Sequence, residues 1–135
     1  MKRAAVIVCA VLLLAACGGG NRAIDQIKAA YTGFFTTKTS LAAHVALVQD
    51  GAKFESVIQS FLSNPLANGV SATVSSVTLQ GENKAKVVYT VKIAIGSLKD
   101  QTGYAVLEDG KWKVADETLC GLVSLAGTTP PACKS

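Results

Sequence analysis

The hydrophobic period of the chain changes at Gly69, and this change constrains the fold more than any other feature. Between Arg22 and Gly69, apolar residues recur at spacings of three and four, which is typical of amphipathic helices. After Gly69, apolar and polar residues alternate, as they do in strands with one buried face. We therefore expect helices first and an antiparallel sheet after them.

Three helices are predicted before the change of period. The first covers residues 22–35. The second runs from a cap at Thr39 or Ser40 to a point near Gly51, and the third covers residues 54–62. Each helix has one apolar stripe, so we expect all three to pack against a common core.

The first two strands are predicted over residues 70–79 and 85–95. The alternation of the first strand changes phase toward Val77 and Leu79, which predicts either a bulge or a strand that crosses the edge of the core. The second strand has the most regular alternation in the chain, and we place Ile95 on its buried face.

A loop over residues 96–101 is expected to lead to a third strand over residues 102–107. The pair Asp109-Gly110 is a hairpin signal, so a fourth strand is expected over residues 112–115. Asp116 is then placed to cap a last helix, which would bury Leu119, Leu122, Val123 and Ala126.

This order of elements predicts an α+β fold. The N-terminal helices would pack in the concave face of a curved four-stranded antiparallel sheet, and a short C-terminal helix would close the domain. We divide the chain into a signal peptide over residues 1–16, a lipidated cysteine with a flexible glycine tether over residues 17–21, and a single α+β domain over residues 22–135.

The segment Leu14-Ala15-Ala16-Cys17 resembles a bacterial lipobox. Lys2 and Arg3 precede an apolar run over residues 4–16, which is the pattern of a signal peptide. A transmembrane helix is the alternative, but the run is shorter than the roughly 20 residues that span a bilayer. We therefore predict cleavage before Cys17, attachment of a diacylglyceryl group with acyl chains such as palmitate to its sulfur through a thioether, and an extracytoplasmic protein anchored by lipid to the membrane of the cell envelope.

Two of the four cysteines are expected to form a disulfide. Cys9 lies in the predicted signal peptide, and Cys17 is the predicted lipidation site. Cys120 and Cys133 then remain as free thiols in an oxidising compartment, where they should pair. The bridge would hold the tail over residues 127–131 against the domain. A redox site is the alternative, but neither cysteine lies in a CxxC motif or beside a histidine.

Charge and composition argue against several classes of partner. The formal charge of +4 falls to +2 without Lys2 and Arg3, and the remaining basic residues are scattered along the chain, so we expect no nucleic acid partner. One histidine and two paired cysteines leave no ligand cluster for a metal. The glycines at positions 18–20 are not followed by the Lys-Ser or Lys-Thr of a phosphate loop. No cofactor is predicted.

Several segments resemble actinobacterial lipoproteins related to the mycobacterial low-molecular-weight secreted antigen. These segments are Tyr31-Thr32-Gly33-Phe34-Phe35, residues 45–51, the strand pair over residues 70–95, residues 109–114, and Pro130-Pro131-Ala132-Cys133. The resemblance covers roughly residues 22–135. It implies a cone-shaped fold similar to that of nuclear transport factor 2, in an exported protein of the actinobacterial envelope. It carries over no catalytic residue, because no activity is firmly attached to the family.

By analogy, a cone-shaped fold suggests a concave interior that holds an apolar ligand. The candidate lining residues are the large aromatic side chains on the predicted inward faces: Tyr31, Phe35, Phe54, Tyr89, Tyr104 and Trp112. The alternative is that these side chains simply fill the core. A ligand-binding protein should have a cavity of at least about 300 Å³ lined by these aromatic side chains, whereas an interaction module should have a filled core and an exposed apolar patch of several hundred Å².

We therefore expect a non-catalytic envelope lipoprotein that binds an apolar small molecule, a lipid or a protein partner near the membrane. One alternative is an accessory interaction subunit of an envelope or transport complex with no ligand. A small isomerase-like enzyme is the other, and it needs an acid or base held in the cavity. We expect His44 at the surface, and the position of Asp116 and Glu117 at a helix start is explained by capping.

Overall fold

Helices pack against one side of a four-stranded sheet in the computed structural model, which describes residues 21–125, 127 and 129–133. A helix over residues 21–35 is followed by α2 (Leu41–Ala46), η1 (Gly51–Phe54), α3 (Glu55–Ser63) and η2 (Pro65–Ala67). After the sheet come α4 (Asp116–Leu125) and η3 (Pro131–Cys133). This order confirms the predicted α+β fold class. The predicted signal peptide, Cys17 and Ala126 lie outside the described residues.

The sheet is an antiparallel meander in the order β1 (Ser71–Leu79), β2 (Lys84–Ile93), β3 (Gly96–Glu108) and β4 (Lys111–Val114). The register of β1 against β2 shifts between Val74 and Ser76, which confirms the bulge predicted from the change of phase. Asp109 and Gly110 both have positive φ, of 54° and 76°, as a two-residue hairpin turn requires. This turn was also predicted.

The connection from β2 to β3 differs from the sequence prediction. Gly96 pairs with Ile93, and Ser97 pairs with Lys92, so residues 96–101 belong to β3 and the predicted loop there is wrong. The turn takes only two residues, and it leaves the side chain of Ile95 93% exposed rather than buried. The ladder between β2 and β3 continues through polar residues, and a register shift near Tyr89 accommodates it. The alternation of apolar residues does not predict backbone pairing between polar segments.

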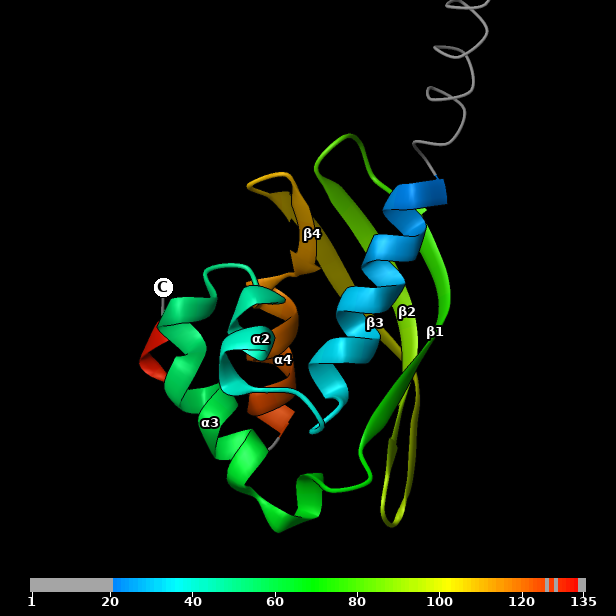
Figure 1. Ribbon diagram of the computed structural model, residues 1–135. Coiled ribbons are helices and arrows are strands. Elements are labelled where there is room, and N and C mark those ends of the chain that lie inside the picture. Colours follow the sequence, from blue (N-terminus) through cyan, green and yellow to red (C-terminus); the bar gives the residue numbers. More distant parts are fainter. Residues whose placement is uncertain (1–20, 126, 128, 134–135) are drawn as a thin grey trace, which may run out of the picture.

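The helix over residues 21–35 lies along the inner face of the bent sheet (Figure 1). It buries Ile27, Ala30 and Tyr31 in one hydrophobic cluster with the inward side chains of β2, which are Ala85, Val87, Tyr89 and Val91. Complete burial of a side chain such as Ile27 contributes about 1.5–3 kcal/mol. The predicted apolar stripe of this helix therefore forms the centre of the core.

Helix α2 is shorter than predicted. Ser40 caps it, as expected, because its hydroxyl accepts a hydrogen bond from the Ala43 N–H. The helix ends at Ala46 rather than near Gly51, since the following residues pair with β4. Gln49 N–H donates to the Val114 carbonyl at 2.8 Å, and Val114 N–H donates to the Leu47 carbonyl at 2.8 Å. This pairing covers the free edge of β4.

The prediction that His44 lies at the surface is wrong, because its side chain is fully buried. Nδ1 lies 2.8 Å from the Ser40 carbonyl oxygen and 3.1 Å from Thr39 Oγ1, and Nε2 contacts the Thr36 carbonyl oxygen. The imidazole thus satisfies backbone groups of the segment between the 21–35 helix and α2. Its role is to hold this connection in place.

Within residues 21–125, 127 and 129–133, no helix combines the length and the apolar character needed to span a membrane.

Candidate functional site

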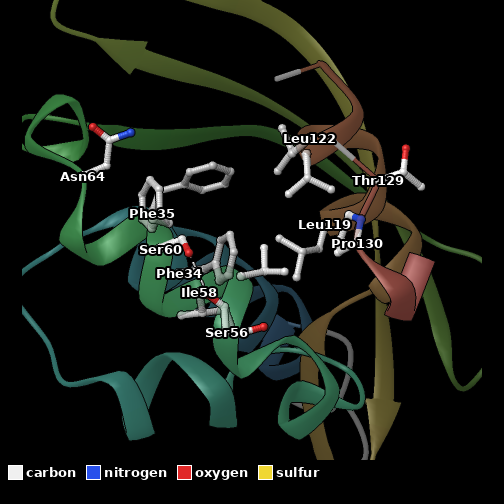
Figure 2. A pocket seen from close by; sticks show the side chains of 13 residues that line it. Phe34, Phe35, Ser56, Ile58, Ser60, Asn64, Leu119, Leu122, Thr129 and Pro130 are labelled. Atoms are coloured by element: carbon white, nitrogen blue, oxygen red, sulfur yellow. Dashed lines mark hydrogen bonds between the residues drawn. The ribbon is translucent and has the colours of Figure 1, made fainter. Parts of the chain in front are cut away.

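An apolar pocket of about 630 Å³ lies between the C-terminal end of the 21–35 helix, α3, α4 and the segment that follows α4. Its volume falls within the range of roughly 300–1,000 Å³ that is usual for small-molecule sites. Figure 2 shows the lining side chains converging from these separate parts of the chain. The pocket is therefore a product of tertiary packing.

Four buried side chains form the floor of the pocket: Phe34, Phe35, Ile58 and Leu119. The rings of Phe34 and Phe35 meet edge to face, with their centroids 5.2 Å apart. The ring of Phe61 is nearly parallel to that of Phe34, at 6.4 Å. These are favourable aromatic geometries. They fix the shape of the floor and leave apolar ring surface facing the cavity.

The walls come from α3 and α4. Val57 and Phe61 on α3, and Leu122 and Val123 on α4, are half-buried and line the cavity. On α4 the spacing of Leu119, Leu122 and Val123 places all three on one face of the helix. Helix α3 ends at Ser63, and the next residue, Asn64, is extended because proline disfavours helical geometry in the residue that precedes it. Asn64 therefore lies at the rim.

Polar groups lie at the rim rather than in the centre. Ser56, Ser60, Asn64 and Thr129 are exposed, and Figure 2 shows Asn64 and Thr129 at opposite ends of the cavity. The Ser60 hydroxyl donates to the Ser56 carbonyl at 3.0 Å. Among the described lining residues, none has an ionisable side chain. The site thus offers apolar surface with uncharged polar groups around its opening.

The last wall is a C-terminal strap, which we define as residues 129–133. Thr129 and Pro130 line the pocket. The strap is joined to α4 by the disulfide between Cys120 and Cys133, whose Cα atoms are 5.5 Å apart. The predicted disulfide is confirmed, and it does hold the tail against the domain. Figure 1 shows the end of the strap beside α3.

Of the six aromatic residues proposed from the sequence as cavity lining, Phe35 lines this pocket and the other five lie elsewhere. Tyr31, Phe54, Tyr89 and Trp112 are buried in the core. Tyr104 lies on the outer side of the sheet, where Lys84 Nζ is 4.6 Å from the centre of its ring. The inner face of the sheet is filled by side chains, so the cavity forms beside the helices instead.

Burial perturbs two of these tyrosines. It raises the pKa of Tyr89 from 10.0 to about 12. It also raises the pKa of Tyr31, despite the opposing effect of the hydrogen bond with Thr118. The Tyr31 hydroxyl donates to the Tyr104 carbonyl at 2.7 Å, and the Tyr31 and Tyr89 rings are 5.0 Å apart. Both hydroxyls stay protonated at neutral pH and serve packing.

The sequence interpretation missed most of the pocket residues as a site. Phe34, Ile58, Phe61, Leu119 and Leu122 appeared only as members of helical stripes. One signal pointed to the correct region, since the expected disulfide returned the tail to the domain next to α4. The periodicity of the sequence did not indicate which apolar helix faces pack against one another.

Residues 21–130 match the family of the low molecular weight antigen MTB12, C-terminal domain. The chain belongs to this family. The resemblance found in the sequence is confirmed by this match. The chain is also similar to a solved structure, an NTF2-like protein of unknown function from Exiguobacterium sp. 255-15. That structure has 14% sequence identity and a TM-score of 0.40, and the alignment covers 69% of this chain and 94% of that one. No curated protein matches this chain.

Proposed function

We propose that this member of the MTB12 family is a non-catalytic lipoprotein of the cell envelope that binds an apolar small molecule or a lipid chain in the pocket between α3, α4 and the strap. The observation that carries the proposal is the apolar cavity of about 630 Å³ with its buried floor of Phe34, Phe35, Ile58 and Leu119. Binding of an apolar ligand in a cavity of this size is favourable, because the ligand displaces water from apolar surface.

The lining chemistry favours binding over catalysis. Acid–base chemistry needs an ionisable group within hydrogen-bond reach of the ligand, and the described lining residues offer hydroxyls and an amide at the rim instead. Within the described residues, every buried side-chain nitrogen and oxygen has a hydrogen-bond partner. The ligand class that fits is an uncharged apolar molecule, or an amphipathic one whose head group stays outside the rim.

The position of the pocket also bears on the proposed anchor. The floor residues Phe34 and Phe35 stand at the C-terminal end of the 21–35 helix, whereas the tether would join residue 21 at the other end. A helix of this length spans about 22 Å at 1.5 Å per residue. A protein anchored through Cys17 would therefore hold the pocket on the side of the domain away from its own anchor, open to ligands from the aqueous phase or from a partner.

The test is native mass spectrometry of the mature protein purified from its own envelope, followed by organic extraction of whatever is bound without a covalent link. We expect a discrete extra mass of an apolar compound. Ser60→Trp should abolish it, because Ser60 is exposed on α3 at the pocket rim and a tryptophan there would fill the cavity.

Gln59→Trp is the matched control. Gln59 is exposed one residue earlier on α3 and lines a different surface groove, with Leu41 and Lys53. The same substitution there should leave the bound mass intact. A bare mass in the wild type, or a bound mass that survives Ser60→Trp, would overturn the proposal and favour an interaction module without a ligand.

A further inference from the structure

We infer that the C-terminal strap is the movable wall of the pocket, and that the Cys120–Cys133 disulfide controls ligand affinity by fixing this wall in place. The inference rests on the proposed function, because it assigns a gate to the same pocket. The main observation is that two features of the strap lie close together. The residues that line the cavity on the strap and the disulfide that joins the strap to the domain lie within five residues of each other.

The strap has few attachments other than the disulfide. Its hydrogen bond within the described part of the chain is local, from Cys133 N–H to the Pro130 carbonyl at 2.9 Å. Thr129, Pro131 and Ala132 are exposed, and only Pro130 and Cys133 are half-buried. A segment this exposed, with no hydrogen bond from residues 129–133 to the rest of the described chain, opens at low free-energy cost once its covalent link is removed.

The α4 side of the pocket, to which the strap is bonded, is fixed much more firmly. Cys120 lies on α4, next to Leu119, which is 4% exposed in the core and also forms part of the pocket floor. The disulfide therefore ties the mobile wall to the rigid floor across a sequence separation of 13 residues. If the bond opens, the floor stays and one wall is free to leave.

The chemistry of opening is simple. A dithiol attacks the Cys120–Cys133 bond and transfers two electrons and two protons, so that the protein gains two thiols and the dithiol becomes a cyclic disulfide. We expect the reduced protein to keep its core and to present a more open site, with the floor and the two walls from α3 and α4. We expect its affinity for an apolar ligand to fall by about tenfold or more, within the usual range of coupling between two sites.

Linkage makes the effect reciprocal. If the disulfide raises the affinity for a ligand by a given factor, a saturating ligand stabilises the disulfide against the dithiol by the same factor. The change in ligand affinity on reduction and the change in disulfide stability on ligand binding thus measure the same coupling free energy.

The experiment uses the full chain and the uncharged fluorescent probe phenylnaphthylamine, titrated before and after reduction with dithiothreitol. Circular dichroism records whether the reduced domain stays folded. The equilibrium between disulfide and dithiol is then measured with and without saturating probe. We expect the probe affinity to fall by about tenfold on reduction, and the disulfide equilibrium to shift by an equal factor when the probe is present.

A pair of proline variants tests the wall without touching sulfur. Pro130→Gly removes a side chain that lines the pocket, whereas Pro131→Gly makes the same change at an exposed position outside it. With the disulfide intact, Pro130→Gly should weaken probe binding and Pro131→Gly should not. This comparison tests the strap as a wall of the pocket even if the reduced protein unfolds, and unchanged binding in Pro130→Gly would overturn the inference.

The outcomes separate the two proposals. Binding that is lost in Ser60→Trp but unchanged by reduction and by Pro130→Gly leaves the pocket as the binding site and overturns the gate. Probe binding that Ser60→Trp does not affect overturns the proposed function, and the gate falls with it.

Discussion

The Thr118 hydroxyl forms hydrogen bonds with the backbone of Tyr104 at the point where β4 no longer pairs with β3. Its Oγ1 accepts a hydrogen bond from Tyr104 N–H at 2.8 Å and lies 3.3 Å from the Tyr104 carbonyl oxygen, to which it donates. β4 ends at Val114, opposite Ala105, so Tyr104 is the first residue of β3 beyond the ladder. Helix α4 thereby closes the edge of the sheet where β4 stops.

This arrangement predicts that Thr118→Val destabilises the protein by about 1–3 kcal/mol, because valine has the same shape but leaves Tyr104 N–H without its acceptor. The Tyr104 carbonyl would keep the Tyr31 hydroxyl and Ala115 N–H as donors. Urea unfolding measures the loss. Thr118→Ser retains the hydroxyl and should cost less, and equal stability of the valine variant and the wild type would contradict this account.

Gly103 is required by close packing around the same residues. A Cβ at this position would lie 2.5 Å from Tyr31 Oη, 2.8 Å from Thr118 Cγ2 and 3.0 Å from Tyr89 Cε1. Gly103→Ala should therefore destabilise the domain by about 1–3 kcal/mol through overpacking. Thermal unfolding provides the measurement.

Gly121→Ala is the control for this substitution. Gly121 lies in α4, and a Cβ there would meet no other atom within 4 Å. Alanine is a better helix former than glycine, so this variant should gain about 0.5–1 kcal/mol. If Gly103→Ala lowers the free energy of unfolding and Gly121→Ala raises it, the effect of packing is separated from that of backbone entropy. If both variants are stabilised, the clash at Gly103 is relieved by a shift of its neighbours.

Alkaline pH should destabilise the protein through its buried tyrosines. An unfolded tyrosine titrates near pH 10, whereas burial raises the pKa of Tyr89 to about 12 and also raises that of Tyr31. Above about pH 10 the unfolded state therefore binds fewer protons than the folded state, and the free energy of unfolding falls by up to about 1.4 kcal/mol per pH unit for each tyrosine. The stabilisation is complete below pH 10.

Chemical denaturation between pH 8 and pH 12 tests this dependence, and Tyr89→Phe isolates the contribution of one tyrosine. The variant should show a shallower decline than the wild type above about pH 10. Parallel curves would mean that Tyr89 ionises as easily in the folded protein as in the unfolded chain.

Lipidation at Cys17 predicts that cells fed labelled palmitate will label the wild-type protein, whereas Cys17→Ala will remain unlabelled and keep its signal peptide. The reason is that the sulfur atom of Cys17 would carry the diacylglyceryl group, and alanine has no such atom. Two acyl chains are needed for firm anchoring. Cys9→Ala is the control, because Cys9 lies in the predicted signal peptide. Its mature protein should be labelled like the wild type, and label on Cys17→Ala would show that the lipid is attached elsewhere.

The sequence by itself determined the local structure and the covalent link. Residues 24–35 have apolar side chains at helical spacing, Asp109-Gly110 supports positive φ, and the phase shift before Val77 marks a bulge, so each of these features follows from nearby residues. The pairing of Cys120 with Cys133 followed from the small number of cysteines available.

Tertiary structure decided what each apolar face meets. Periodicity marks Phe34, Ile58 and Leu119 as buried, but only packing brings these side chains and Pro130 around one cavity. Packing also ended α2 early, by pairing the residues that follow it, Leu47 and Gln49, with β4, and it enclosed His44 among backbone carbonyls. The physical reason is that local patterns specify that a surface leaves water, whereas the choice of partner surface depends on shapes contributed by distant parts of the chain.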